Sequence, residues 1–141
     1  DDVLDLVEQL ADRYDASLEA TARRVVAVHP RPTLLLALEP ACKPTQPHAK
    51  PILRVQWKHA GDDWPFVPQH KSVPDNGVFG RALHGEAINE TTSLGDLTNP
   101  TISRAFVSAA LYPYYDDQGE HHMRVLALIT RANSPQTHHA R

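Results

Sequence analysis

Two apolar runs near the end of the chain constrain its fold more than any other feature. Residues 104–114 and 122–130 are β-rich, and the polar segment 115–121 between them contains two Asp residues and a Gly. Short polar turns of this composition between such runs are typical of antiparallel hairpins. The sequence therefore predicts that the fold closes on a hairpin within a sheet.

Three earlier segments add further extended structure. The apolar run Thr33–Leu38 lies between two prolines, which predicts a strand buried on both faces or covered by helices. Residues 64–68 carry two prolines and predict a short segment at a sheet edge. Residues 86–92 are expected to extend as well.

The segment 52–58 has a different pattern. Its apolar positions are Ile52 or Leu53, Val55 and Trp57, and they alternate with Arg54, Gln56 and Lys58. A period of two is expected of a half-buried antiparallel strand. We therefore expect one wet face and one buried face along the whole segment.

A short helix is predicted between these strands, from about Gly77 to His84. Asp75 or Asn76 is a suitable N-cap, because their side chains accept hydrogen bonds from the first helical amides. Gly85 is a suitable stop, because glycine readily adopts the left-handed conformation that ends many helices.

The N-terminal region predicts two helices joined by a corner. Ser17 is placed to cap the second helix, and Glu19 lies near the positive end of its dipole. The apolar positions that recur at helical spacing are Val3, Leu6, Val7, Leu10 and Tyr14 before the corner and Leu18, Ala22, Val25 and Val26 after it. Both helices therefore carry an apolar stripe.

Charge limits what this helical corner can bind. Residues 1–30 contain seven acidic and three basic side chains, whereas the remainder carries eleven basic and ten acidic side chains. Nucleic-acid binders gain affinity by neutralising phosphates with Lys and Arg. The excess of four negative charges therefore argues against DNA as a partner of the corner.

Length and composition indicate one folded core. The chain has 141 residues with 41% hydrophobic side chains, enough for a helical pair attached to a domain of roughly 100 residues. No apolar run approaches the roughly 18 residues that cross a bilayer, so we expect a soluble, cytoplasmic protein without a membrane partner. Cys42 is the single cysteine, and the chain starts at Asp1 without Met, which we interpret as a fragment of a longer protein.

These segments together predict an α+β fold. It consists of an N-terminal helix-turn-helix-like pair and an antiparallel sheet of about five strands with a covering helix. The layout and the closing hairpin resemble a GAF-like sensor domain. The corresponding boundaries are a helical link over 1–30, a GAF-like domain over 31–132 and a polar tail over 133–141.

The corner itself also resembles a known family. Leu10-Ala11, Ser17, Glu19-Ala20 and Arg23-Arg24 resemble a helix-turn-helix and also the helical module after the catalytic helix of ImmA/IrrE zinc metallopeptidases. In that family's radiation-response regulators, a GAF-like domain follows the helices. The resemblance implies a parent peptidase that cleaves a transcriptional repressor in a stress or mobile-element response, with zinc bound in a domain upstream of this chain.

The chain lacks the peptidase motif itself. Its chemistry requires two His residues one helical turn apart and a Glu beside the first. Glu120-His121-His122 has the residue types without the spacing, and adjacent residues of a strand point to opposite faces. We therefore predict no catalytic residue, no metal site and no cofactor within this chain.

A small-molecule pocket is the remaining candidate site. The resemblance to GAF-like domains implies a ligand held between the sheet and its covering helix, with apolar walls and a few polar anchors. The candidate residues are Trp57, Trp64, Phe66, Phe79, Arg81, Arg104 and Tyr112. The alternative is that the aromatic residues among them simply form the core.

Two other functions stay open from the sequence. One is a transcription regulator that binds DNA through the helical corner and senses a ligand through the sheet domain. The other is a protein-interaction module without a ligand, which would expose an apolar patch.

Overall fold

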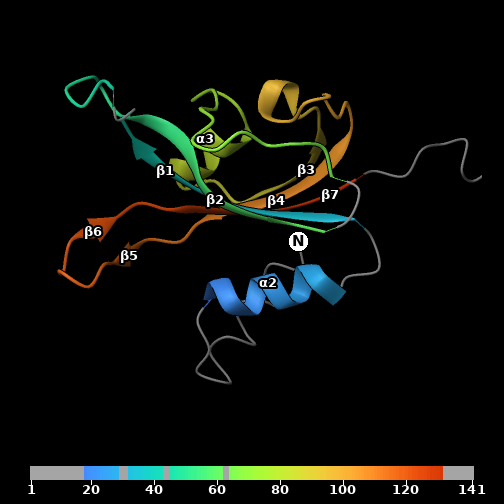
Figure 1. The fold of residues 1–141 in the computed structure, drawn as a ribbon, viewed down its shortest axis with the longest axis horizontal. Coiled ribbons are helices and arrows are strands. Elements are labelled where there is room, and N and C mark those ends of the chain that lie inside the picture. The colour runs from blue at the N-terminus through green and yellow to red at the C-terminus, as the bar shows by residue number, and fades with distance from the viewer. Residues whose placement is uncertain (1–17, 29–31, 43–44, 62–63, 132–141) are drawn as a thin grey trace, which may run out of the picture.

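The computed structural model describes residues 18–28, 32–42, 45–61 and 64–131. Helix α2 and strands β1 and β2 come first, and helix α3 and strands β3 to β7 follow (Figure 1). Their bounds are α2 Leu18–Val28, β1 Thr33–Ala41, β2 Ile52–Ala60, α3 Val78–Leu83, β3 Ile88–Thr92, the 3-10 helix η1 Gly95–Leu97, β4 Ala105–Leu111, β5 Tyr114–Tyr115, β6 His121–His122 and β7 Val125–Arg131. In the described residues, no helix is long and apolar enough to span a membrane.

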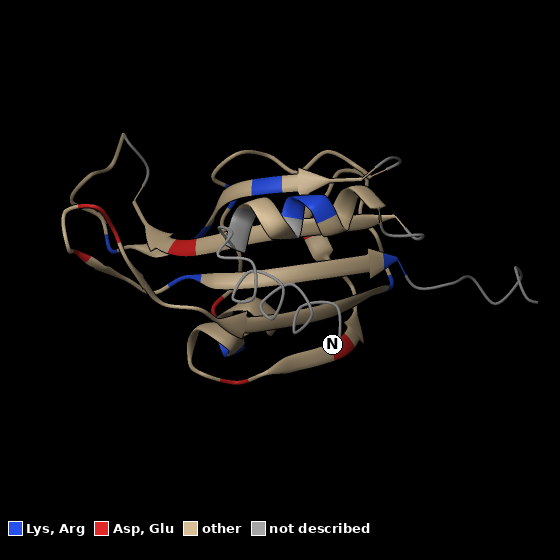
Figure 2. Ribbon diagram, turned by 90° about the horizontal axis from the view of Figure 1, so that it is seen from below, with Lys and Arg blue, Asp and Glu red and all other residues tan. Residues whose placement is uncertain are grey.

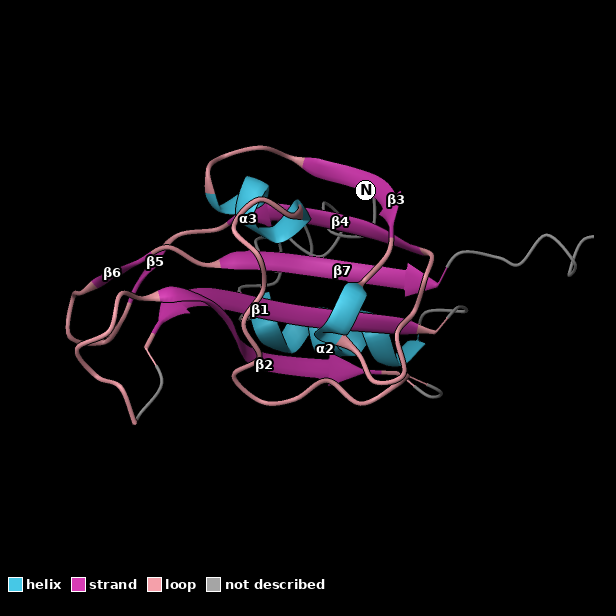
Figure 3. Cartoon of the chain, turned by 90° about the horizontal axis from the view of Figure 1, so that it is seen from above, coloured by secondary structure: helices cyan, strands magenta, loops and turns pink. Residues whose placement is uncertain are grey.

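A five-stranded antiparallel sheet forms the centre of the molecule. Its strand order is β2-β1-β7-β4-β3, which Figure 3 shows from the α3 side. Helix α2 lies on one face of the sheet and α3 on the other (Figure 1). The predicted α+β fold with about five antiparallel strands is confirmed at this level.

Strand β1 is buried on both faces. Leu34, Leu36 and Leu38 pack in the α3-side core, whereas Leu35 and Ala37 pack in the α2-side core. All five side chains are fully inaccessible to solvent. The uninterrupted apolar run is explained because alternate residues of this inner strand enter two different cores.

Helix α2 covers the sheet through two valines. Val26 is buried and Val25 half-buried against Leu35 and Leu128. The second helix of the predicted corner therefore exists. The first helix, Ser17, the side chains of Leu18 and Ala22, and the predicted tail 133–141 lie outside the described residues.

Helix α3 is shorter than predicted and has a different cap. Its N-cap is Gly77, which makes no side-chain hydrogen bond, so the predicted capping by Asp75 or Asn76 is wrong. The Asp75 carboxylate instead lies 3.3 Å from the His84 ring at the other end of the helix. Gly85 ends the helix region with φ +101°, as predicted.

Strand β2 changes face in its middle. Val55 pairs with Leu38 and Trp57 with Ala37, so Gln56 is an extra residue in a β-bulge. Val55 consequently packs on the α3 side and Trp57 on the α2 side. The prediction that these two side chains share one buried face is wrong because the bulge reverses the alternation.

The outer edge of β2 is covered by residues 71–73. The Val55 amide donates to the Lys71 carbonyl at 2.9 Å, and the Val73 amide to the Leu53 carbonyl at 3.0 Å. Arg54 was predicted to be exposed to solvent, but it is buried and donates hydrogen bonds to the Ala41 and His70 carbonyls. Residues 71–73, and not 64–68, therefore occupy this sheet edge.

The closing hairpin forms as predicted and continues beyond the sheet. Strands β4 and β7 pair from Ala105 with Arg131 to Leu111 with Val125. The two sides of the hairpin then remain paired through β5 and β6, which project past the end of the sheet (Figure 1). We call residues 112–124 the hairpin arm.

Candidate functional site

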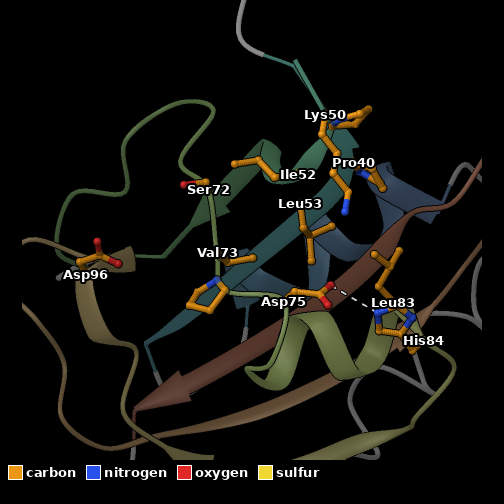
Figure 4. A pocket seen from close by; sticks show the side chains of 12 residues that line it. Pro40, Lys50, Ile52, Leu53, Ser72, Val73, Asp75, Leu83, His84 and Asp96 are labelled. Carbon is orange, nitrogen blue, oxygen red and sulfur yellow. Dashed lines mark hydrogen bonds and ion pairs between the residues drawn. The ribbon is translucent and has the colours of Figure 1, made fainter. Parts of the chain in front are cut away.

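A pocket of about 630 Å³ lies between the start of β2 and the end of α3 (Figure 4). It is lined by Pro40, Lys50, Pro51, Ile52, Leu53, Ser72, Val73, Pro74, Asp75, Leu83, His84 and Asp96. We call it the main pocket. It lies between the sheet and α3.

The sheet holds the walls of the main pocket in place. Leu53 is anchored through β2 pairing with Pro40, and Val73 through its backbone hydrogen bond to Leu53. Leu83 reaches the pocket from the last turn of α3. These apolar side chains come from three segments that are distant in sequence.

The charged groups around the pocket differ in how they are paired. Asp96 accepts a hydrogen bond from the Lys71 amine at 2.9 Å, and this interaction holds the pKa of the Asp96 carboxyl below its usual range. Asp75 lies against His84. Lys50 has no hydrogen-bond or ion-pair partner within the described part of the chain, and Figure 4 shows its amine directed toward Leu53. Among the described residues, Lys50 therefore brings a positive charge without a partner to a pocket that has apolar side chains in its walls.

A second cavity of about 170 Å³ adjoins the main pocket. The two share Val73, Pro74 and Asp96 in their walls. Phe79 of α3 and Leu97 of η1 lie on its other side. The two pockets are therefore neighbours.

The structure distributes the predicted pocket aromatics over both sides of the sheet. Trp57 and Tyr112 pack against the α2-side core, whereas Trp64 and Phe79 belong to the α3-side core. Phe66 is largely exposed, with the Lys58 amine 4.6 Å from its ring centre. Within this set, Phe79 lines the smaller cavity and none lines the main pocket.

The two predicted arginines also lie apart. Arg81 binds Glu90 through both Nη atoms, at 2.7 Å and 3.2 Å, and Glu86 at 2.6 Å. Its guanidinium lowers the pKa values of both carboxyls. Arg104 is exposed just before β4. Arg81 therefore ties α3 to β3, and its donors are already engaged.

A second polar cluster lies at the base of the hairpin arm. The Tyr114 hydroxyl donates to Glu39 Oε2 at 2.7 Å. His122 Nδ1 lies 3.3 Å from Glu39 Oε1, and Nε2 lies 2.8 Å from Asp116 Oδ2. The His122 ring also stacks on Tyr114 with ring centres 4.9 Å apart. Figure 2 shows acidic positions along this projecting part of the molecule.

The pKa values in this cluster shift with its contacts. The hydrogen bond to Asp116 raises the pKa of His122, and the same bond lowers the pKa of Asp116. Burial, reinforced by the bond to Glu39, raises the pKa of Tyr114 to about 12. The contact between them therefore favours a protonated His122 imidazole beside an ionised Asp116 carboxylate.

Three acidic and imidazole groups at this end of the arm lie near one another. Atoms of Asp116, Glu120 and His122 lie within 4.8 Å of one another. Both His122 nitrogens already face carboxylate oxygens, and the Glu120 side chain is largely exposed. We therefore assign the cluster to proton binding and hydrogen bonding.

No site was predicted from the sequence at this cluster, and its histidines were considered only as unsuitable metal ligands. The two adjacent histidines do point apart, since His121 lies against Tyr115 and His122 stacks on Tyr114. Glu39 was not identified, because it is brought to the arm by β1 from 75 residues before Tyr114.

Comparison with protein-family models gives no match for this chain, and comparison with curated proteins gives none either.

Proposed function

We propose that this chain is a GAF-like sensor domain that binds a small molecule with one anionic group and an apolar body in the main pocket. The observation that carries the proposal is the Lys50 amine, which has no partner among the described residues, at a pocket of about 630 Å³ lined in part by apolar side chains. Small-molecule sites are typically clefts of about 300–1,000 Å³ with apolar linings and few polar anchors.

The charge pattern supports an anion over a cation. Asp96 pairs with the Lys71 amine, so its negative charge is partly compensated, and the Asp75 carboxylate contacts the His84 ring. The Lys50 charge lacks such a partner in the described residues. Leu53 and Val73 offer apolar contact for the remainder of the ligand.

The wider proposal is that this domain regulates an ImmA/IrrE-type metallopeptidase that cleaves a transcriptional repressor. It is supported by the Ser17, Glu19 and Arg23-Arg24 pattern and by helix α2 packed on the sheet. The coding sequence upstream of Asp1 tests it. A His-Glu-x-x-His helix there supports the proposal, and its absence from the complete gene contradicts it.

Ligand binding can be tested with three probes that differ in the head group. Hexanoate, hexyl phosphate and hexanol are titrated into ¹⁵N-labelled protein while amide shifts are recorded. We expect the two anions to shift the amides of Leu53, Val73 and Leu83 at lower concentration than hexanol. Equal binding of hexanol, or no shifts at these residues with any probe, contradicts the proposal.

Lys50→Met is the matched test of the anchor. The change should remove the preference for the anions over hexanol and leave the apolar contacts intact. Lys50→Arg should retain the preference, because it keeps the charge. Arg104→Met removes an exposed positive charge outside both cavities and should not alter binding.

A further inference from the structure

Among the residues that the structure describes, the Glu39 carboxylate connects strand β1 to the hairpin arm. Glu39, whose side chain is mostly buried, accepts the Tyr114 hydroxyl with one oxygen and contacts His122 Nδ1 with the other. Across the arm, His122 Nε2 contacts Asp116 in the turn. His122 therefore links both sides of the hairpin arm to β1.

The two contacts of His122 depend on its protonation. A neutral imidazole has one N–H and one lone pair, whereas the imidazolium has an N–H on both nitrogens. In this structure a carboxylate oxygen faces each nitrogen, at 2.8 Å and 3.3 Å. A neutral ring would direct its lone pair at one of these oxygens, so it can satisfy only one of the two contacts.

Most of the charged groups around His122 raise its pKa. Glu39 on β1, Asp116 in the turn and Glu120 at 4.0 Å all favour the charged ring. Tyr114 stacks on the ring, and its raised pKa keeps it neutral around neutral pH. The Arg124 guanidinium lies on the Tyr114 ring, 4.6 Å from its centre. His121 lies against Tyr115.

Glu39 also connects the arm to the main pocket. The next residue, Pro40, lines that pocket, and the following carbonyl, of Ala41, accepts a hydrogen bond from Arg54 at 3.2 Å. Glu39 is therefore separated from the wall of the main pocket by a single peptide bond.

We propose that His122 is a pH-sensitive latch. Its protonated ring holds the hairpin arm against the end of β1, and loss of that proton loosens the arm and shifts the segment 39–41 beside the main pocket. The coupling to ligand binding rests on the proposed function, whereas the latch itself does not.

The latch is tested without any ligand, by NMR titration of the protein between about pH 5 and about pH 9 in a buffer containing EDTA. We expect the His122 ring to titrate with a midpoint above the ordinary value of 6.5. The amides of Ala41 and Tyr115 should shift with the same midpoint. A His122 midpoint at or below 6.5, or an Ala41 amide that does not follow it, overturns the proposal.

Three variants separate the latch from other titrating groups. Glu39→Gln should lower the His122 midpoint, because it removes a facing negative charge, and His122→Gln should abolish the Ala41 transition. His121→Gln, which changes the neighbouring histidine on the other side of the arm, should leave that transition unchanged. Loss of the transition in His121→Gln, or its persistence in His122→Gln, contradicts the latch.

Failure of the latch and failure of the proposed function are distinguishable. Lys50→Met should leave the Ala41 transition intact, since Lys50 makes no contact with the arm cluster in the described structure. If the probes bind but Ala41 does not titrate with His122, only the latch is wrong. If Ala41 titrates but no probe binds, only the pocket assignment is wrong.

Discussion

Gly80 is the glycine whose backbone is most closely approached by the rest of the chain. A Cβ built on Gly80 would lie 1.8 Å from the carbonyl oxygen of Asp75. Backbone atoms cannot yield as the end of a side chain can, so α3 or the segment before it would have to move. This close approach explains why a poor helix former occupies a helix of six residues.

We predict that Gly80→Ala destabilises the domain. Alanine normally favours a helix over glycine by about 1 kcal/mol, but here the clash should outweigh that gain and lower the free energy of unfolding by about 2 kcal/mol. Urea denaturation measures the change. Gly77→Ala is the matched control, because the nearest atom to its Cβ is 3.6 Å away. An equal or smaller loss in Gly80→Ala than in Gly77→Ala contradicts this reading.

Helix α2 is attached to the sheet through one side of its surface. Val26 is 6% exposed against the α2-side core, whereas Val28 is 71% exposed two residues later. Figure 2 shows the basic residues of α2 seen from the side opposite α3, and both Arg23 and Arg24 are exposed. The helix therefore stabilises the domain through a small apolar contact.

The two valines give a matched pair for testing this contact. Val26→Ser should lower the free energy of unfolding by about 2 kcal/mol, because it removes buried methyl groups and buries a hydroxyl. Val28→Ser should change it by less than about 0.5 kcal/mol. Equal effects in chemical denaturation would show that α2 does not depend on its contact with the sheet.

At the scale of the whole molecule, features encoded by one continuous segment could be predicted from the sequence. Features that need distant segments to meet could not. The hairpin of β4 and β7 follows from two runs and their turn, and the double-sided burial of β1 from one apolar run. The bulge at Gln56 has no turn residue to mark it, so the reversal at Trp57 was missed. The main pocket requires β2, α3 and the segment 72–75 to meet, which no local pattern encodes.

The free energy of unfolding of the domain should decrease at alkaline pH, because His122 loses its proton there. Its pKa is raised in the folded state above the ordinary 6.5, mainly by Asp116, so folded protein binds its proton more tightly than unfolded protein. The stabilisation is therefore complete below about pH 6.5 and is lost as the pH rises through the folded pKa. Asp116 has a lowered pKa, so its own contribution is lost only as the pH falls below its ordinary 3.8 and through the folded value. Urea denaturation of wild type and His122→Gln across this range measures the difference. The wild type should exceed His122→Gln in free energy of unfolding most in mildly acidic buffer, and this difference should shrink toward alkaline pH. A difference that grows with pH would mean that His122 is held neutral in the fold.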